Sequence, residues 1–174
     1  MAGRDHVRAA SSAAVKLAYD DFVRFPDDGQ RHELIDGEHY VTPSPNTRHQ
    51  RISRNLLLLI GRWLEDHPIG EVFYAPYDVV FSEFDVVEPD LLYLSNERAA
   101  EVLTPLHARG VPELVVEIGS KGTRKRDDTI KRRLYRQNGQ AFAEPLERSR
   151  AAGDVLTTPL LPGLALPLAR IFKD

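Results

Sequence analysis

The stretch "LVVEIGSKGT", Leu114 to Thr123, combines a short apolar run with a single carboxylate, Glu117. A continuous β-branched run of this length predicts a buried strand over Leu114–Ile118 that is covered on both faces. An unpaired carboxylate in such a strand costs several kcal/mol, or it binds a proton and loses its charge. We therefore expect a partner for Glu117 and a loop in the small residues that follow it.

The composition indicates one globular domain. The chain has 174 residues, of which 42% are hydrophobic, which is enough for a sizeable core. Residues 1–16 lack an apolar signal-peptide core and are expected to form a flexible leader before one domain over 17–174. No apolar run of about 18 residues occurs, so no membrane-spanning helix is predicted. The absence of cysteine excludes disulfides and thiolate sites and fits a cytoplasmic protein.

Hydrophobic periodicity and turn residues predict the order of the elements. Asp36-Gly37 predicts a tight hairpin turn, and Thr47 with Gln50 resembles a capping box that opens a long amphipathic helix. The Pro-rich end of the chain is predicted to dock as an extended tail. The expected elements are a helix over 19–25, the hairpin over 32–41, a helix over 47–66, strands over 70–81, 85–94 and 112–118, a short helix or loop over 96–103, and a helix over 126–138.

A second acidic position, Asp90, follows Pro89 inside a strand pattern. Proline cannot donate to a sheet ladder, so Pro89 predicts an edge or a bulge, which often re-aims a side chain. If the strands of Asp90 and Glu117 are neighbours, the two carboxylates meet, and a proton or a divalent cation must lie between them. Mg²⁺ typically takes one or two carboxylates, several waters and a phosphate oxygen.

The helix after Glu117 adds Lys131, with Tyr135 on the same face. A lysine beside a bound metal and a phosphate can stabilise negative charge or orient water. An ordinary helical ion pair with Asp127 would also explain Lys131. His49 lies on the apolar stripe of the first long helix, where a hydrogen-bonded core histidine is the simpler interpretation.

The basic residues concentrate in one window. Between Lys121 and Arg136 eight basic residues stand against two aspartates, giving this window +6 and the rest of the chain −9. Such a segment fits a surface that binds a polyanion, most commonly nucleic acid, and it equally fits a solvated helix face.

These motifs together resemble the PD-(D/E)XK nuclease superfamily, and within it a bacterial family of restriction-endonuclease-like proteins. The motifs, in order over about residues 17–139, are "HELIDGE", "PSPNTRH", "EPD", "VEIGSKGT" and "DDTIKRRLY". The resemblance implies an α/β (α+β) fold with a restriction-endonuclease-like core, in which helices flank a mixed, curved sheet.

The resemblance also implies roles for individual residues. Asp90 and Glu117 would be the metal-binding carboxylates, with the backbone carbonyl of Ile118 and the Glu33 carboxylate as further ligands. Gly119 occupies the usual position of the superfamily's lysine, so Lys131 would replace it, with Lys121 as the competitor. The candidates for supporting the ligands or for a structural role are His49, Ser120, Lys121, Thr123, Asp127 and Tyr135, and the nucleic-acid-binding candidates are Arg124, Lys125, Arg126, Arg132, Arg133 and Arg136.

One segment departs from the family. The strand and hairpin that usually follow "YRQNG" are missing near residues 139–141, which indicates either an internal deletion or an omitted stretch. The motifs predict a Mg²⁺- or Mn²⁺-dependent endonuclease that hydrolyses DNA, and analogy suggests a homodimer. An inactive DNA-binding or oligomeric scaffold that keeps the fold is the alternative. A Ser-His-Asp hydrolase is disfavoured because no G-x-S-x-G motif occurs.

Overall fold

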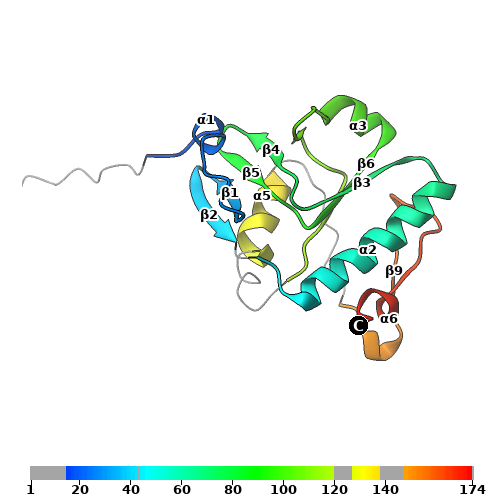
Figure 1. Ribbon diagram of the computed structural model, residues 1–174. Helices are drawn as coiled ribbons and strands as arrows, with labels where there is room; N and C mark the ends of the chain where they lie inside the picture. The colour runs from blue at the N-terminus through cyan, green and yellow to red at the C-terminus, as the bar shows by residue number, and fades with distance from the viewer. Residues whose placement is uncertain (1–14, 43, 120–126, 138–146, 174) are drawn as a thin grey trace, which may run out of the picture.

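The computed structural model describes residues 15–42, 44–119, 127–137 and 147–173, and helices flank β-sheets in this part of the chain (Figure 1). The predicted α+β class with a mixed sheet is confirmed. Its strands are β1 (Arg31–Ile35), β2 (Glu38–Thr42), β3 (Gly70–Tyr74), β4 (Val79–Ser82), β5 (Asp85–Val87), β6 (Leu91–Ser95), β7 (Ala108–Arg109), β8 (Leu114–Val116), β9 (Val155–Leu156) and β10 (Leu166–Pro167).

The described strands form three sheets. A mixed sheet has the order β2-β1-β5-β4-β7, in which only the β4–β7 pair is parallel. A three-stranded antiparallel sheet has the order β3-β6-β8, and β9 pairs with β10. Each of the two long strands predicted over 70–94 is therefore divided between two sheets. The divisions fall at Pro76 and at Pro89, whose missing N–H groups cannot continue a ladder.

The helices are α1 (Tyr19–Phe22), α2 (Thr47–Asp66), α3 (Asn96–Val102), α5 (Arg132–Gln137), which follows a π-helical turn η1 (Asp127–Lys131), a 3₁₀ turn η2 (Arg150–Ala152), and α6 (Leu168–Ile171). The bounds of α2 match the prediction. Its cap does not, because the side chain of Asn46, not of Thr47, accepts from the backbone N–H of His49. Asn and Asp suit this position since a short side-chain oxygen can reach the free N–H groups of the first turn.

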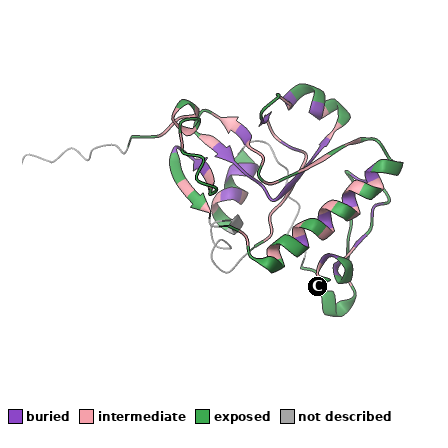
Figure 2. Cartoon of the chain, in the orientation of Figure 1, coloured by how far each residue is buried: buried purple, intermediate pink, exposed green. Residues whose placement is uncertain are grey.

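The core of the three-stranded sheet is built on the apolar stripe of α2 and on the C-terminal segment. Ile52, Leu56, Ile60 and Leu64 recur at helical spacing and are buried (Figure 2). Leu161 and other residues of the C-terminal segment pack against this stripe. The predicted tail docks on the core, but it is not extended throughout, because the residues after its last proline, Pro167, form the short helix α6. Among the described residues, no helix is both long and apolar enough to cross a bilayer.

The β1–β2 turn has the predicted chemistry. Asp36 and Gly37 both have positive φ, 53° and 74°, as a two-residue hairpin turn of this hand requires. The ladder pairs Ile35 with Glu38 and runs without interruption to Arg31 and Thr42. The turn therefore sets the register of β1.

Substituting Gly37 by alanine should destabilise the fold by about 1–2 kcal/mol, because the φ is unfavourable for a Cβ. An added Cβ would also lie 2.6 Å from Cβ of Lys16. The control is Gly61→Ala in α2, where no atom lies within 4 Å and alanine should add up to about 1 kcal/mol. Urea unfolding measures both free energies, and a loss of the same size in both variants would contradict the assigned turn.

Candidate active site

Strand pairing brings the two predicted carboxylates together. In the antiparallel β6–β8 pair, Leu91 lies opposite Val116 and Leu92 opposite Val115. Continuing this register by one residue sets Asp90 opposite Glu117, and residues directly opposite each other project to the same side of a sheet. In agreement, the N–H of Ile118 donates to Oδ2 of Asp90 over 2.7 Å. The strands that carry the two carboxylates are therefore neighbours, which is the condition under which the carboxylates could meet.

Lys131 is held between two of the predicted carboxylates. Its Nζ lies 2.8 Å from Oε1 of Glu33 and 3.1 Å from Oε1 of Glu117, and its side chain is only 2% exposed. The Tyr135 hydroxyl, one helical turn on, donates to the same Glu117 oxygen over 2.6 Å. Lys131 is thus a buried counter-ion for these carboxylates, and Tyr135 directly contacts Glu117.

Arg31, which the sequence reasoning missed, holds the other half of the site. Its Nη1 donates to Oδ1 of Asp90 over 3.0 Å, and its Nε lies 3.3 Å from Oε2 of Glu88. Its Nη2 also donates to the carbonyl of Glu88. Successive residues of a strand alternate between faces, so Arg31 shares a face with Glu33. The sequence signal for Arg31 is its position two residues before Glu33, which places both side chains on the same face of β1.

A hydrogen bond between Glu88 and Glu33 joins the ion pairs of Arg31 to those of Lys131. The backbone N–H of Glu88 donates to Oε1 of Glu33 over 3.0 Å, and Glu33 is completely buried. One connected cluster therefore contains four carboxylates and two cations, which we call the ionic cluster: Arg31, Glu33, Glu88, Asp90, Glu117 and Lys131.

His49 reaches the same cluster from α2. Its Nε2 lies 3.1 Å from Oδ2 of Asp90, and its Nδ1 is buried without a hydrogen-bond partner. The side chain therefore contacts a candidate ligand directly instead of serving only as a core residue.

Burial has the largest effect on the pKa values of Glu117 and Glu88. Removal from water raises the pKa of Glu117 to about 7, although Lys131 and the Tyr135 hydroxyl act in the opposite direction. Burial likewise raises the pKa of Glu88 to about 7 against the effect of Arg31. Burial also opposes the charge of Lys131, but the Glu117 and Glu33 carboxylates outweigh it and raise its pKa.

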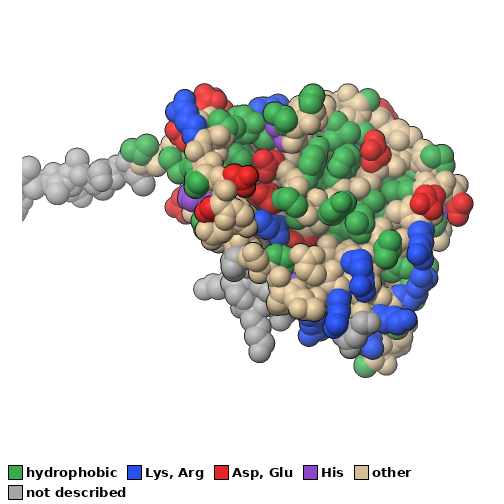
Figure 3. All heavy atoms as spheres, in the orientation of Figure 1, with side chains coloured by type: hydrophobic (Ala, Val, Ile, Leu, Met, Phe, Trp, Pro, Cys, Tyr) green, Lys and Arg blue, Asp and Glu red, His purple; other side chains and the backbone are tan. Residues whose placement is uncertain are grey.

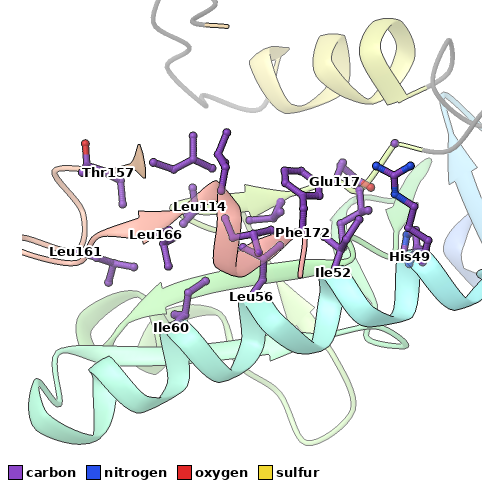
Figure 4. A pocket seen from close by; sticks show the side chains of 18 of the residues that line it. His49, Ile52, Leu56, Ile60, Leu114, Glu117, Thr157, Leu161, Leu166 and Phe172 are labelled. Atoms are coloured by element: carbon purple, nitrogen blue, oxygen red, sulfur yellow. The ribbon is translucent and has the colours of Figure 1, made fainter. Parts of the chain in front are cut away.

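Two cavities border the ionic cluster. An apolar cavity of about 950 Å³ lies between α2, β8 and the C-terminal segment, and Glu117 and His49 stand at one end of it (Figure 4). A smaller, polar cavity of about 280 Å³ is lined by Arg31, Glu88 and Asp90. His49 lines both cavities, the polar one together with Asp90 and the apolar one together with Glu117.

Several predicted residues lie elsewhere. Ser120, Lys121, Thr123, Arg124, Lys125 and Arg126 fall outside the described residues, as does the side chain of Asp127. In α5, Arg133 and Arg136 are exposed and Arg132 is half-buried. Of the two competing lysines, Lys131 lies in the described part of the chain and contacts Glu117, whereas Lys121 lies outside it.

The oxygen donors of the cluster fit a hard divalent cation. Four carboxylates against two cations leave a net charge of −2 when all are ionised, which one divalent ion would balance. Lys131 and Tyr135 both contact Oε1 of Glu117, so its Oε2 is the oxygen that could face a cation. Within the described ranges no group of three or more His, Cys, Asp or Glu side chains is arranged to hold a metal. A cation here would accordingly depend on Asp90, Glu117 and the Ile118 carbonyl, with water completing its shell.

Comparison with known proteins agrees with this arrangement of motifs. The model of the Uma2 family, described as "Putative restriction endonuclease", matches residues 19–141, which include the whole ionic cluster. The chain belongs to the Uma2 family. Its structure also resembles the crystal structure of a "putative nuclease belonging to DUF820" from Anabaena variabilis ATCC 29413. That match has a TM-score of 0.72 and 16% identity and covers 90% of this chain and 97% of the other. A search of the curated proteins found no match.

The raised pKa of Glu117 predicts how stability depends on pH in this Uma2 protein. In the unfolded chain Glu117 titrates near 4.5, so between pH 4.5 and about 7 only the folded state retains the proton. The metal-free protein should therefore lose up to about 3 kcal/mol of unfolding free energy as the pH rises through this window.

Urea unfolding at pH 5, 6 and 7 in EDTA measures this loss. Glu117→Gln should flatten the dependence, leaving the part that Glu88 contributes in the same direction. An equally steep decline in the wild type and in the variant would contradict the burial of an ionisable Glu117.

Proposed function

We propose that this protein is a divalent-metal-dependent endonuclease that hydrolyses phosphodiester bonds in DNA. The observation that carries the proposal is the buried contact of Lys131 with Glu117, beside the strand position of Asp90. Family membership supports nuclease activity in general, and the oxygen-rich cluster supports dependence on Mg²⁺ or Mn²⁺.

Asp90, Glu117 and the carbonyl of Ile118 would hold the ion. When bound, such an ion lowers the pKa of a water and polarises the scissile phosphate. Lys131 holds the Glu117 carboxylate in place, and its positive charge, close behind Glu117, would help to stabilise negative charge that develops on the phosphate. Glu33 keeps Lys131 at this position, so we give Glu33 a supporting role next to its candidate role as a ligand.

Arg31 and Tyr135 would act as positioning residues. Arg31 fixes Oδ1 of Asp90, and Tyr135 fixes Oε1 of Glu117, so that each carboxylate keeps one defined orientation. A homodimer, in which each copy cuts one strand, completes the proposal for duplex substrates.

A catalytically inactive DNA-binding scaffold is the second candidate, and one observation favours it. Both oxygens of Asp90 already have protein partners, namely Arg31 on Oδ1, and His49 and Ile118 on Oδ2. A cation would have to share these oxygens. The two candidates are separated by metal binding as well as by cleavage.

The test is cleavage of duplex and single-stranded DNA with Mg²⁺ or Mn²⁺. Asp90→Ala and Glu117→Ala should each slow cleavage by at least about 100-fold, because each removes a ligand of the ion. Glu97→Ala, which removes an exposed carboxylate on α3, should cleave like the wild type. Calorimetric titration with Mn²⁺ should show one site in the wild type and a weakened site in both cluster variants.

Undiminished cleavage by purified Asp90→Ala and Glu117→Ala would refute the assigned site. DNA binding by the wild type without Mn²⁺ binding and without cleavage would support the scaffold instead.

A further inference from the structure

One side of α2 is strongly basic. Arg48, Arg51, Arg54 and Arg62 are all exposed, and the helix contains no acidic residue before Glu65. At 3.6 residues per turn, Arg48, Arg51 and Arg62 fall within one narrow stripe beside the buried apolar face. The stripe from Arg48 to Arg62 is about 21 Å long at 1.5 Å per residue.

The C-terminal segment adds further cations beside this stripe. Asn55, in the middle of α2, donates through Nδ2 to the carbonyls of Ile171 and Lys173, each over 3.0 Å. Arg54 donates to the side-chain oxygen of the same Asn55, at 3.0 Å from Nη2. Arg150 donates to the carbonyl of Phe172 over 3.1 Å. These bonds attach the end of the chain, with its own cations, to the exposed side of α2.

We call the result the basic face: Arg48, Arg51, Arg54, Arg62, Arg150, Arg170 and Lys173. All seven side chains are exposed, and residues 155–173 contain no acid. Figure 3 shows Lys and Arg side chains gathered over α2 and the neighbouring C-terminal segment. The net charge of the chain is −3, so the rest of the chain carries −10 without these seven cations.

The basic face begins at the candidate active site. Arg48 lines the apolar cavity together with Glu117 and Gly119, so one end of the stripe lies where the proposed ion would bind. A polyanion that follows the stripe therefore reaches Glu117 without crossing an acidic surface on α2.

We propose that the basic face binds the phosphate backbone of DNA and leads it to Glu117. This inference rests on the proposed nuclease function for the choice of polyanion. A stripe of about 21 Å matches roughly six base pairs at 3.4 Å per phosphate of one strand. Contacts of this kind hold and orient the duplex and do not read its sequence.

The basic face differs from the basic window that the sequence singles out. Within the described part of that window, Lys131 is buried in the ionic cluster, and only Arg133 and Arg136 are exposed arginines. The face draws instead on α2 and on residues about 100 positions later in the chain. The two surfaces can therefore be tested against each other.

The experiment measures binding of a fluorescent duplex by anisotropy in EDTA, from about 50 to 200 mM salt, with no cleavage required. The face variant carries Arg51→Ala, Arg62→Ala and Arg170→Ala. The matched control carries Arg24→Ala, Arg98→Ala and Arg109→Ala, with the same change in net charge; all three arginines lie outside the face, Arg24 and Arg109 being exposed and Arg98 half-buried. A third protein carries Arg133→Ala and Arg136→Ala. Thermal melting verifies that each is folded.

The face variant should bind at least about 10-fold more weakly at low salt, and its slope of log K against log salt should decrease by about 2 to 3, since each lost phosphate contact removes about 0.9. The control should bind like the wild type. Wild-type binding by the face variant would overturn the inference, as would an equal loss in the control. Loss only in the Arg133 and Arg136 protein would assign binding to the window instead.

The outcomes also separate this inference from the proposed function. Cleavage by a wild type whose face variant binds normally would leave the nuclease intact and refute the basic face. A face-dependent affinity in a protein that never cleaves would keep the basic face and refute the nuclease. A wild type that binds no duplex would refute the basic face, and the cleavage assay would then decide the proposed function by itself.

Discussion

Glu33 has no exposure to water, and the structure around it is organised by the need to balance its charge. Lys131 provides the nearest cation, and its own burial would be prohibitive without Glu33 and Glu117. Breaking a buried pair of this kind typically costs about 3–5 kcal/mol, because the remaining charge has neither water nor a partner. Glu33, Glu117 and Lys131 are consequently dependent on one another, and the strands and the helix that carry them are held in a fixed arrangement.

The same reasoning explains why β1 is central to the site. Arg31 and Glu33 project from one face of β1, and each contacts a different pair of groups in the ionic cluster. The hydrogen bond from Glu88 to Glu33 connects the two pairs. Rotation of one carboxylate would thus disturb the partners of the others, which favours a preorganised site over one assembled by the substrate.

The sequence predicted what depends on local pattern and failed where distant segments meet. The α2 bounds and the Asp36-Gly37 turn follow from periodicity and turn chemistry, whereas the pairing of the strands of Asp90 and Glu117 stayed a condition until the structure showed it. Arg31 was missed because its function depends on a pairing with Asp90 that lies 59 residues away.

The basic face could not be recognised in the sequence for a related reason. Its residues are scattered between Arg48 and Lys173, and tertiary contacts such as the bonds of Asn55 bring them together. The window of residues 121–136 is recognisable in the sequence because its charges are contiguous. The burial of Lys131 in it, however, depends on tertiary contacts that a count of charges does not detect.

The two-residue turn at Asp36 and Gly37 has a consequence for the lengths that the β1–β2 hairpin can adopt. Side chains of a strand alternate between its two faces. A change of one residue in the turn that shifted β1 by one position in its pairing would therefore turn Arg31 and Glu33 toward the opposite face. The ionic cluster would then face His32 and Leu34 in place of Arg31 and Glu33, and Glu88, Asp90 and Lys131 would each lose a counter-ion. Leu34 would also leave the apolar cluster in which it is now buried. A surface turn usually tolerates insertions, but this one indirectly sets the charge balance of the site, so its length should be as restricted as the identity of the ionic residues.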